Sequence, residues 1–218
     1  MTEFVTGKER KQNADGIWMQ MAAAAAVLLS VFAAYESVFP TGIKPGIIGG
    51  IVAAVVFLLS LLVRKKEHLG RKLLLLMVFM GMLAASGKER LLGGSAPFVN
   101  RYIEQRNLFY HVEQPGIEAA ADSVGELAVL AGILLLLGAI LLVTLRIRQG
   151  SVLLLPVMLL PVILAATVGH MPSSLTVWGM LSAGSLYLIV YHRVDGVIPL
   201  REIATAAVVL AVLYLCTV

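Results

Sequence analysis

The sequence contains few charged residues. Lys, Arg, Asp and Glu make up 14% of its 218 residues, whereas a soluble domain carries about 25%. Hydrophobic residues reach 59% and the mean hydropathy is +0.91. The apolar residues come in blocks close to the ~20 residues with which a helix spans a bilayer. The shortage of charge therefore excludes an ordinary water-facing domain and predicts an all-α integral membrane protein.

Cysteine is almost absent as well. The single Cys216 excludes an internal disulfide and a multi-cysteine metal site within one chain. It lies in an apolar run, without the positive and partly exposed surroundings that a reactive thiolate needs. No two of the four histidines have helical metal-ligand spacing. We therefore expect no metal and no cofactor. The histidines are His68, His111, His170 and His192.

Recognisable catalytic motifs are also missing. The sequence has no G-x-x-x-x-G-K-[ST] loop, no G-x-S-x-G elbow and no H-E-x-x-H pair. Ionisable residues are costly inside a bilayer, and Glu36, Lys44 and Glu126 stand at the ends of apolar blocks, which is typical of interfacial charges. Ser123-Val-Gly-Glu126 matches the capping box of a helix start. We accordingly predict that this chain carries no catalytic residue.

Seven apolar blocks predict a bundle of about seven transmembrane helices in one polytopic domain, residues 16–218. Residues 1–15 are polar, and we expect a flexible cytoplasmic tail there. Gly46-x-x-x-Gly50 is compatible either with close helix approach or with a turn. The last block has 16 residues, just short of the usual ~17–25, so its full crossing stays open. The predicted spans are about 17–37, 47–63, 73–92, 124–145, 151–168, 175–191 and 203–218.

The one long polar segment covers residues 87–122. Within it, Phe98, Tyr102 and Phe109 share much of one helical face with charges between them. This pattern predicts an amphipathic helix lying on the outer face of the membrane, and it makes the segment the best candidate for a partner contact. The candidate contact residues are Phe98, Asn100, Tyr102, Arg106, Asn107, Phe109 and Tyr110.

The distribution of basic residues predicts the orientation. With the N-terminus inside, twelve of the 17 Lys and Arg residues fall in inner segments and five in outer segments, as the positive-inside rule requires. Seven spans then place the C-terminus outside the cytoplasm, in a multi-pass protein of the plasma membrane. The net charge of +4 follows from these flanking residues, so we expect a lipid bilayer as partner and no nucleic acid.

Five features of residues 17–193 occur together: the order of spans, Phe98-Val-Asn100, Asn107-Leu-Phe-Tyr110, Leu159-Leu-Pro161 and Gly169-His-Met-Pro172. Through these features, the region resembles the N-terminal membrane region of bacterial, especially Gram-positive, multi-pass transglutaminase-like proteins. The resemblance implies helices that precede an extracytoplasmic domain with a Cys-His-Asp triad. That domain is absent here, and Cys216 lacks the polar surroundings of the family's nucleophile, so no catalytic residue is carried over.

These observations favour a non-catalytic membrane domain that anchors or positions an extracytoplasmic, transglutaminase-like domain or partner. The chain would then end just before such a domain. The alternative is a small permease or transporter subunit for a neutral or apolar substrate, with broken helices at Pro156, Pro161 and Gly169 lining its path. An intramembrane enzyme is the third hypothesis. A polar cavity at mid-membrane would favour a transporter, converging ionisable side chains would favour an enzyme, and a dry apolar interior would favour the anchoring domain.

Overall fold

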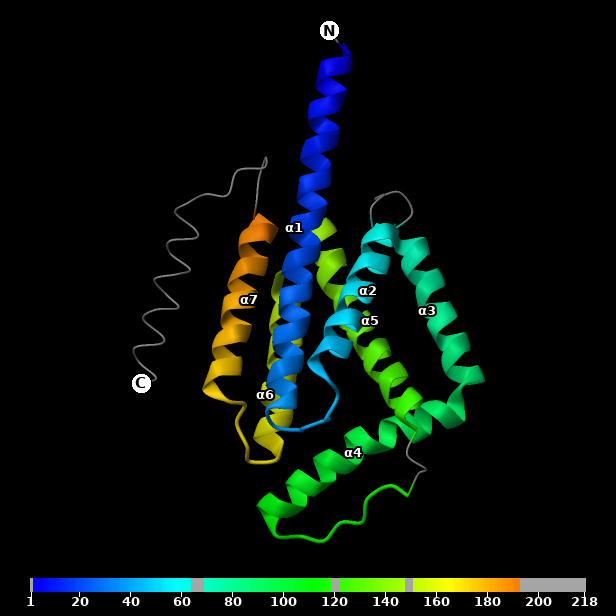
Figure 1. The fold of residues 1–218 in the computed structure, drawn as a ribbon, viewed down its shortest axis with the longest axis vertical. Coiled ribbons are helices and arrows are strands. Elements are labelled where there is room, and N and C mark those ends of the chain that lie inside the picture. The colour runs from blue at the N-terminus through cyan, green and yellow to red at the C-terminus, as the bar shows by residue number, and fades with distance from the viewer. Residues whose placement is uncertain (1, 64–68, 119–121, 148–150, 193–218) are drawn as a thin grey trace.

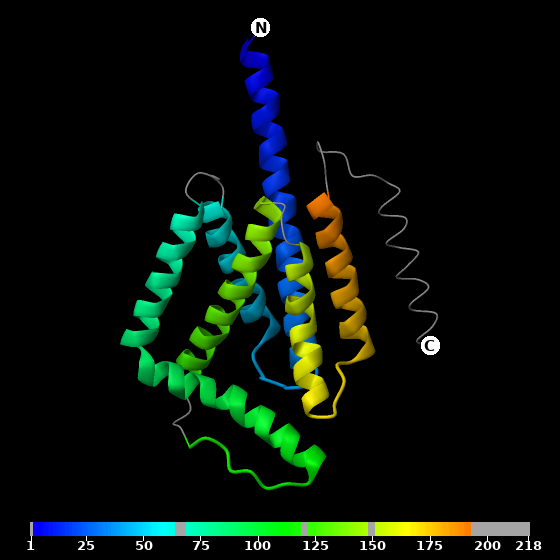
Figure 2. The same cartoon turned by 180° about the vertical axis from the view of Figure 1, so that it is seen from behind.

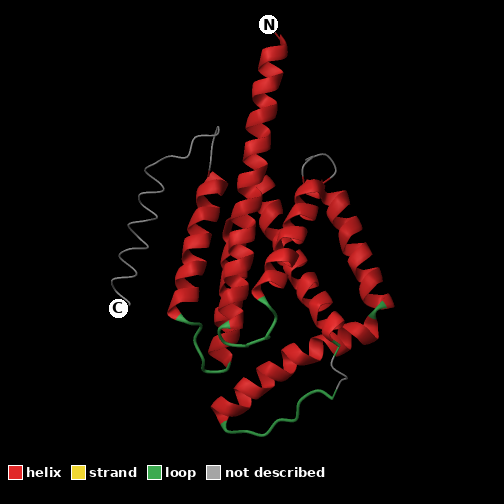
Figure 3. Ribbon diagram, viewed as in Figure 1, coloured by secondary structure: helices red, strands yellow, loops and turns green. Residues whose placement is uncertain are grey.

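The computed structural model describes residues 2–63, 69–118, 122–147 and 151–192, and this part of the chain is all-helical (Figures 1 and 3). The predicted all-α class is therefore confirmed. The elements are α1 Thr2–Glu36, α2 Pro45–Val63, α3 Leu69–Ser86, α4 Lys88–Tyr110, α5 Ser123–Ile147, the 3-10 helix η1 Ser151–Leu153, α6 Leu154–Thr167 and α7 Ser174–His192.

Five of these helices are long and apolar enough to cross a membrane, judged by length and composition over the described residues. They are α1 from Gly16, α2, α3, α5 to Leu145, and α7. The apolar helix α6 is shorter, with 14 residues. The predicted seventh span, 203–218, lies outside the described residues, as do His68 and Cys216.

Proline and glycine decide where several helices begin and end. Pro45 is the first residue of α2, where its missing N–H costs no helical hydrogen bond. At the end of α6, Gly169 has φ +67°, and its N–H donates to the carbonyl of Ala166. The N–H of His170 donates to the carbonyl of Ala165, which completes a Schellman motif. The chain thus turns at 37–44 between α1 and α2, and at 168–173 between α6 and α7.

Two predicted segments differ from the structure. Helix α1 begins at Thr2, so the expected flexible tail is helical; no proline interrupts the chain from there to Glu36. The predicted third span, 73–92, is too long, because α3 ends at Ser86 and the chain turns at Gly87 into α4. Leu91 and Leu92 therefore belong to a helix with another direction.

Helix α1 lies at the centre and packs against α2, α5, α6 and α7. Its alanine run buries Ala23 and Ala24 completely, and small side chains allow helices to approach closely. In contrast, a Cβ added to Gly46 or Gly50 would meet nothing within 4 Å. The interpretation of these two glycines as a helix contact is therefore wrong within the described residues.

Taken in chain order, helices α1, α2, α3, α5, α6 and α7 run in alternating directions, which defines two ends of the bundle (Figures 1 and 2). The turn 37–44, helix α4, the segment 111–118 and the turn 168–173 lie at one end, called the α4 end below. The opposite end holds Val63, Leu69, Ile147 and His192.

Candidate functional site

Helix α4 lies across the end of the bundle and closes it (Figure 1). It crosses α5 at two glycines with almost no space between the backbones. A Cβ on Gly94 would lie 2.1 Å from the carbonyl carbon of Gly125, and a Cβ on Gly125 would lie 2.4 Å from the carbonyl oxygen of Arg90. Both positions therefore require glycine. Sequence reasoning missed this crossing, because the two residues are far apart in the chain and share no spacing motif.

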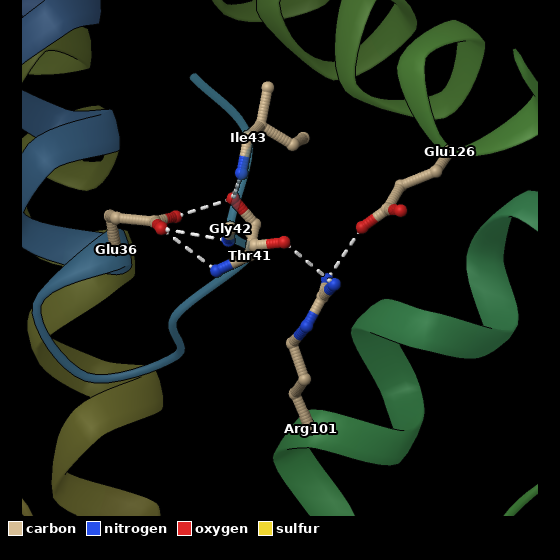
Figure 4. Close-up of polar contacts among 6 residues, drawn as sticks. All are labelled: Glu36, Thr41, Gly42, Ile43, Arg101 and Glu126. Carbon is tan, nitrogen blue, oxygen red and sulfur yellow. Dashed lines mark hydrogen bonds and ion pairs between the residues drawn. The ribbon is translucent and has the colours of Figure 1, made fainter. Parts of the chain in front are cut away.

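A charged pair connects the same two helices to the turn after α1 (Figure 4). Arg101 Nη1 donates to Glu126 Oε1 at 2.6 Å, and Arg101 Nη2 donates to the carbonyl oxygen of Thr41 at 3.0 Å. The two charged side chains are only 22% and 16% exposed. One guanidinium thus joins α4, α5 and the turn 37–44, since its planar fork can address two acceptors at once.

A second carboxylate holds the turn in the position that this contact requires. Glu36 accepts hydrogen bonds from Thr41 N at 2.8 Å, Thr41 Oγ1 at 2.6 Å and Gly42 N at 3.2 Å. Gly42 has φ +72°, a conformation that glycine adopts without strain. Glu36 and Glu126 are therefore structural groups at the bundle end, each with its own partner.

The predicted capping box at residues 123–126 is wrong. Asp122 precedes the first residue of α5, and its Oδ1 accepts the N–H of Val124 at 3.0 Å. Asp122 is thus the N-cap, and the Glu126 carboxylate bonds Arg101 instead of the helix start. The sequence pattern could not show this, because the competing partner comes from another helix.

Two aromatic side chains of α4, Phe98 and Tyr102, face the protein. The ring centroid of Phe98 lies 6.4 Å from that of Tyr35, and the ring centroid of Tyr102 lies 6.1 Å from that of Phe39. The Tyr102 hydroxyl also donates to Thr167 Oγ1 at 3.2 Å. The predicted amphipathic helix is present, but this part of its apolar face covers the bundle end and does not lie in lipid.

Two asparagines on another side of α4 hold the chain that follows it. Asn100 Nδ2 donates to Ile117 O at 3.1 Å, and Asn100 Oδ1 accepts from Ile117 N at 2.7 Å. Asn107 makes the same pair of bonds to Gln114. Asn107 Nδ2 donates to Gln114 O at 2.9 Å, and Asn107 Oδ1 accepts from Gln114 N at 3.2 Å. Residues seven apart lie on one helical face, so both amides pair with one extended segment, much as a neighbouring strand would.

We expect the double substitution Asn100→Ala and Asn107→Ala to loosen the segment 111–118 without unfolding the bundle. Each lost hydrogen bond contributes about 1 kcal/mol, so the amides of Gln114 and Ile117 should exchange at least ~5-fold faster. Hydrogen exchange read by mass spectrometry checks this. Glu104→Ala, on the exposed side of α4, is the matched control and should leave exchange unchanged. Equal protection in the double variant would contradict the assignment.

The candidate contact residues thus divide into two groups. Phe98, Asn100, Tyr102 and Asn107 make the internal contacts described above, and Arg106 Nη1 donates to Gln114 Oε1 at 3.0 Å. The outermost pair differs: Phe109 and Tyr110 are 51% and 53% exposed. Phe109 also packs on Gly169, where an added Cβ would lie 2.0 Å from the ring. Among the candidate contact residues, it is therefore the pair at the C-terminal end of α4 that is exposed.

Polar chemistry is sparse in the rest of the described chain. No group of three or more His, Cys, Asp or Glu residues is placed there to hold a metal ion. His111 and His170 are both exposed at the α4 end. An apolar cavity of about 390 Å³ lies between α1, α4, α5 and α6. The bundle end combines this cavity, the Arg101–Glu126 pair and the exposed end of α4.

The arrangement defines a class of protein: a multi-pass helical membrane protein whose helices contact the lipid bilayer and whose bundle is closed at one end by a transverse helix. Comparisons of the chain with models of protein families, with curated proteins and with solved structures found no match. The function must therefore be argued from the geometry of the α4 end.

Proposed function

We propose that this chain is a non-catalytic membrane domain that anchors and positions an extracytoplasmic domain or partner at its α4 end. The supporting observation is an exposed apolar patch at the C-terminal end of α4, called the α4 patch. Exposed apolar patches often mark sites where a protein partner binds. The patch consists of Leu108, Phe109, Tyr110 and Val112, with exposed fractions of 65%, 51%, 53% and 42%.

The patch sits on a firmly held support. The Gly94–Gly125 crossing, the Arg101–Glu126 pair and the two asparagine contacts fix α4 and the chain after it from three sides. A preorganised surface loses little conformational entropy when a partner binds. This is the property that a positioning platform needs.

The proposal includes an orientation. Basic residues flank the spans mainly on the side of the N-terminus, and such residues favour the cytoplasm. The α4 end then faces outward from the plasma membrane, and a span over 203–218 would carry the C-terminus to the same side. A transglutaminase-like domain is the first candidate occupant, because the family resemblance implies one on that side.

A permease remains the second candidate, restricted to an apolar substrate. Buried polar side chains within the spans bond backbone carbonyls of the bundle: Ser60 Oγ donates to Phe57 O at 2.7 Å, and Tyr187 OH of α7 donates to Leu141 O of α5 at 2.8 Å and contacts Thr144 Oγ1. The cavity between the described helices is lined mainly by apolar side chains. The apolar cavity is the observation that favours this alternative.

Cysteine crosslinking in intact cells tests whether the α4 end binds an extracytoplasmic domain or partner. Cys216→Ser provides a cysteine-free background, and Leu108→Cys places a thiol in the α4 patch. We expect a membrane-impermeant maleimide photocrosslinker to react with it from outside and to join it to an extracytoplasmic domain. Gly70→Cys is the control at the opposite end, where an added Cβ meets nothing within 4 Å; it should react only after permeabilisation.

The outcomes separate the parts of the proposal. Reaction of Gly70→Cys from outside would reverse the orientation. If Leu108→Cys reacts from outside but is crosslinked only to lipid, the proposal that the α4 patch positions a protein domain would be wrong. Mass spectrometry identifies the joined domain, and a Cys-His-Asp triad in it would support the transglutaminase-like candidate.

A further inference from the structure

The apolar cavity has the form of a slot open to one side of the bundle. Helices α5 and α6 diverge toward α4, which crosses beneath them (Figure 2), and α1 packs against both and forms the back wall. Phe32, Phe39 and Leu134, which line the slot, are 9%, 1% and 2% exposed. The slot therefore reaches into the core of the bundle.

The mouth of the slot is formed by one residue from each of three helices. Val99 of α4, Ile133 of α5 and Leu160 of α6 line it and are 38%, 45% and 40% exposed. Leu136, three residues after Ile133 on α5, is 59% exposed but does not line the slot. The mouth thus opens on an exposed apolar surface to which α4, α5 and α6 all contribute.

Water is a poor occupant for this space. A volume of about 390 Å³ has room for about 13 water molecules at ~30 Å³ each. Each buried water needs two to four polar partners, but the lining consists almost entirely of hydrocarbon and aromatic side chains. Apolar cavities of this kind stay dry and take up apolar molecules.

We propose that the slot binds an acyl chain of a membrane phospholipid from the leaflet at the α4 end. Its lining from Val129 to Leu137 on α5 extends for about 12 Å at 1.5 Å per residue, less than half of the ~30 Å hydrocarbon core. This depth fits part of one chain whose headgroup stays at the level of α4.

The charge on α4 complements such a headgroup. Ser95 and Val99 line the slot, and residues seven apart share a helical face. Lys88 precedes Ser95 by seven positions and Arg106 follows Val99 by seven. The slot-facing stripe of α4 therefore has a cation at each end: Lys88 is exposed, and Arg106 also donates to Gln114 Oε1. Every phospholipid carries a phosphate anion that a cation attracts.

Photolabelling of the full chain tests the proposal. The protein is reconstituted into vesicles of phosphatidylethanolamine and phosphatidylglycerol that contain a phospholipid with a diazirine in its acyl chain, and adducts are mapped by mass spectrometry. We expect adducts on the deep residues Phe32 and Leu134, in addition to adducts on Leu75 of the lipid-facing helix α3. Adducts confined to outward positions such as Leu75 would overturn the proposal.

Two variants on one helix sharpen the test. Ile133→Trp fills the mouth with an indole and should lower the deep labelling at least ~5-fold relative to the labelling of Leu75. Leu136→Trp adds the same side chain beside the mouth and should leave the ratio unchanged. Equal ratios in both variants would overturn the assignment. If the protein with Ile133→Trp fails to fold, Leu160→Trp blocks the mouth from α6 with the same expected loss. None of these outcomes depends on a partner at the α4 patch.

Discussion

Replacement of Gly94 by alanine is expected to lower the midpoint of thermal unfolding in detergent by about 2–12 °C. A Cβ at this position would lie 2.1 Å from the backbone of Gly125, so α4 and α5 would have to separate. Overpacking of this kind costs about 1–3 kcal/mol, and each kcal/mol corresponds to about 2–4 °C in a chain of this length. Because the obstacle is backbone, a side-chain rearrangement cannot relieve it.

Gly50→Ala is the matched control for this experiment. Gly50 is also helical, in α2, but a Cβ added there meets nothing within 4 Å. Alanine should be neutral or slightly stabilising at this position, by about 0.5–1 kcal/mol, because it restricts the unfolded chain more than glycine does. An equal effect of the two substitutions would show that α4 and α5 do not cross at these glycines.

Replacement of Arg101 by alanine is the second change with a large expected effect. It removes the donor to both Glu126 and the Thr41 carbonyl, and it leaves a mostly buried carboxylate without its partner. Loss of one member of a buried pair costs about 3–5 kcal/mol, and we expect about 2–3 kcal/mol here because water retains some access. Denaturant unfolding in mixed micelles measures this loss of unfolding free energy. Arg90→Ala, on the exposed side of α4, is the control and should change the free energy of unfolding by less than about 0.5 kcal/mol.

A double-mutant cycle separates the pair from other effects. If the contact accounts for the loss, Arg101→Ala combined with Glu126→Ala should destabilise by at least ~1 kcal/mol less than the sum of the single changes. Arg101→Lys should rescue only part of the loss, since a single ammonium cannot reproduce the two-acceptor geometry of the guanidinium. Additive single effects would mean that the two residues act independently.

These two variants also bear on the platform. Both are expected to loosen α4 where it meets α5, while the exposed residues of the α4 patch stay chemically unchanged. Crosslinking from Leu108→Cys should therefore become weaker in either background if a fixed orientation of α4 is what the partner recognises. The stability measurement and the crosslinking measurement would then change together.

The order of apolar and polar residues in the sequence determined the helical class and most of the helix positions. Long apolar blocks permit little else in a bilayer, because backbone polar groups must be paired within each segment. Pro45 at the start of α2 and Gly169 after the end of α6 mark helix ends, because the conformational limits of proline and glycine are local. The amphipathic pattern around Phe98 and Tyr102 likewise predicted a helix, since periodicity depends only on neighbouring residues.

The arrangement at the bundle end was decided by tertiary structure. The partner of Glu126 comes from another helix, the crossing at Gly94 needs a glycine 31 positions further along the chain, and the aromatic stripe covers protein where the local pattern predicts lipid. The apolar slot likewise exists only because α5 and α6 diverge over α4. Such contacts join residues that are distant in the chain, and no periodicity or spacing within one segment specifies which of them meet.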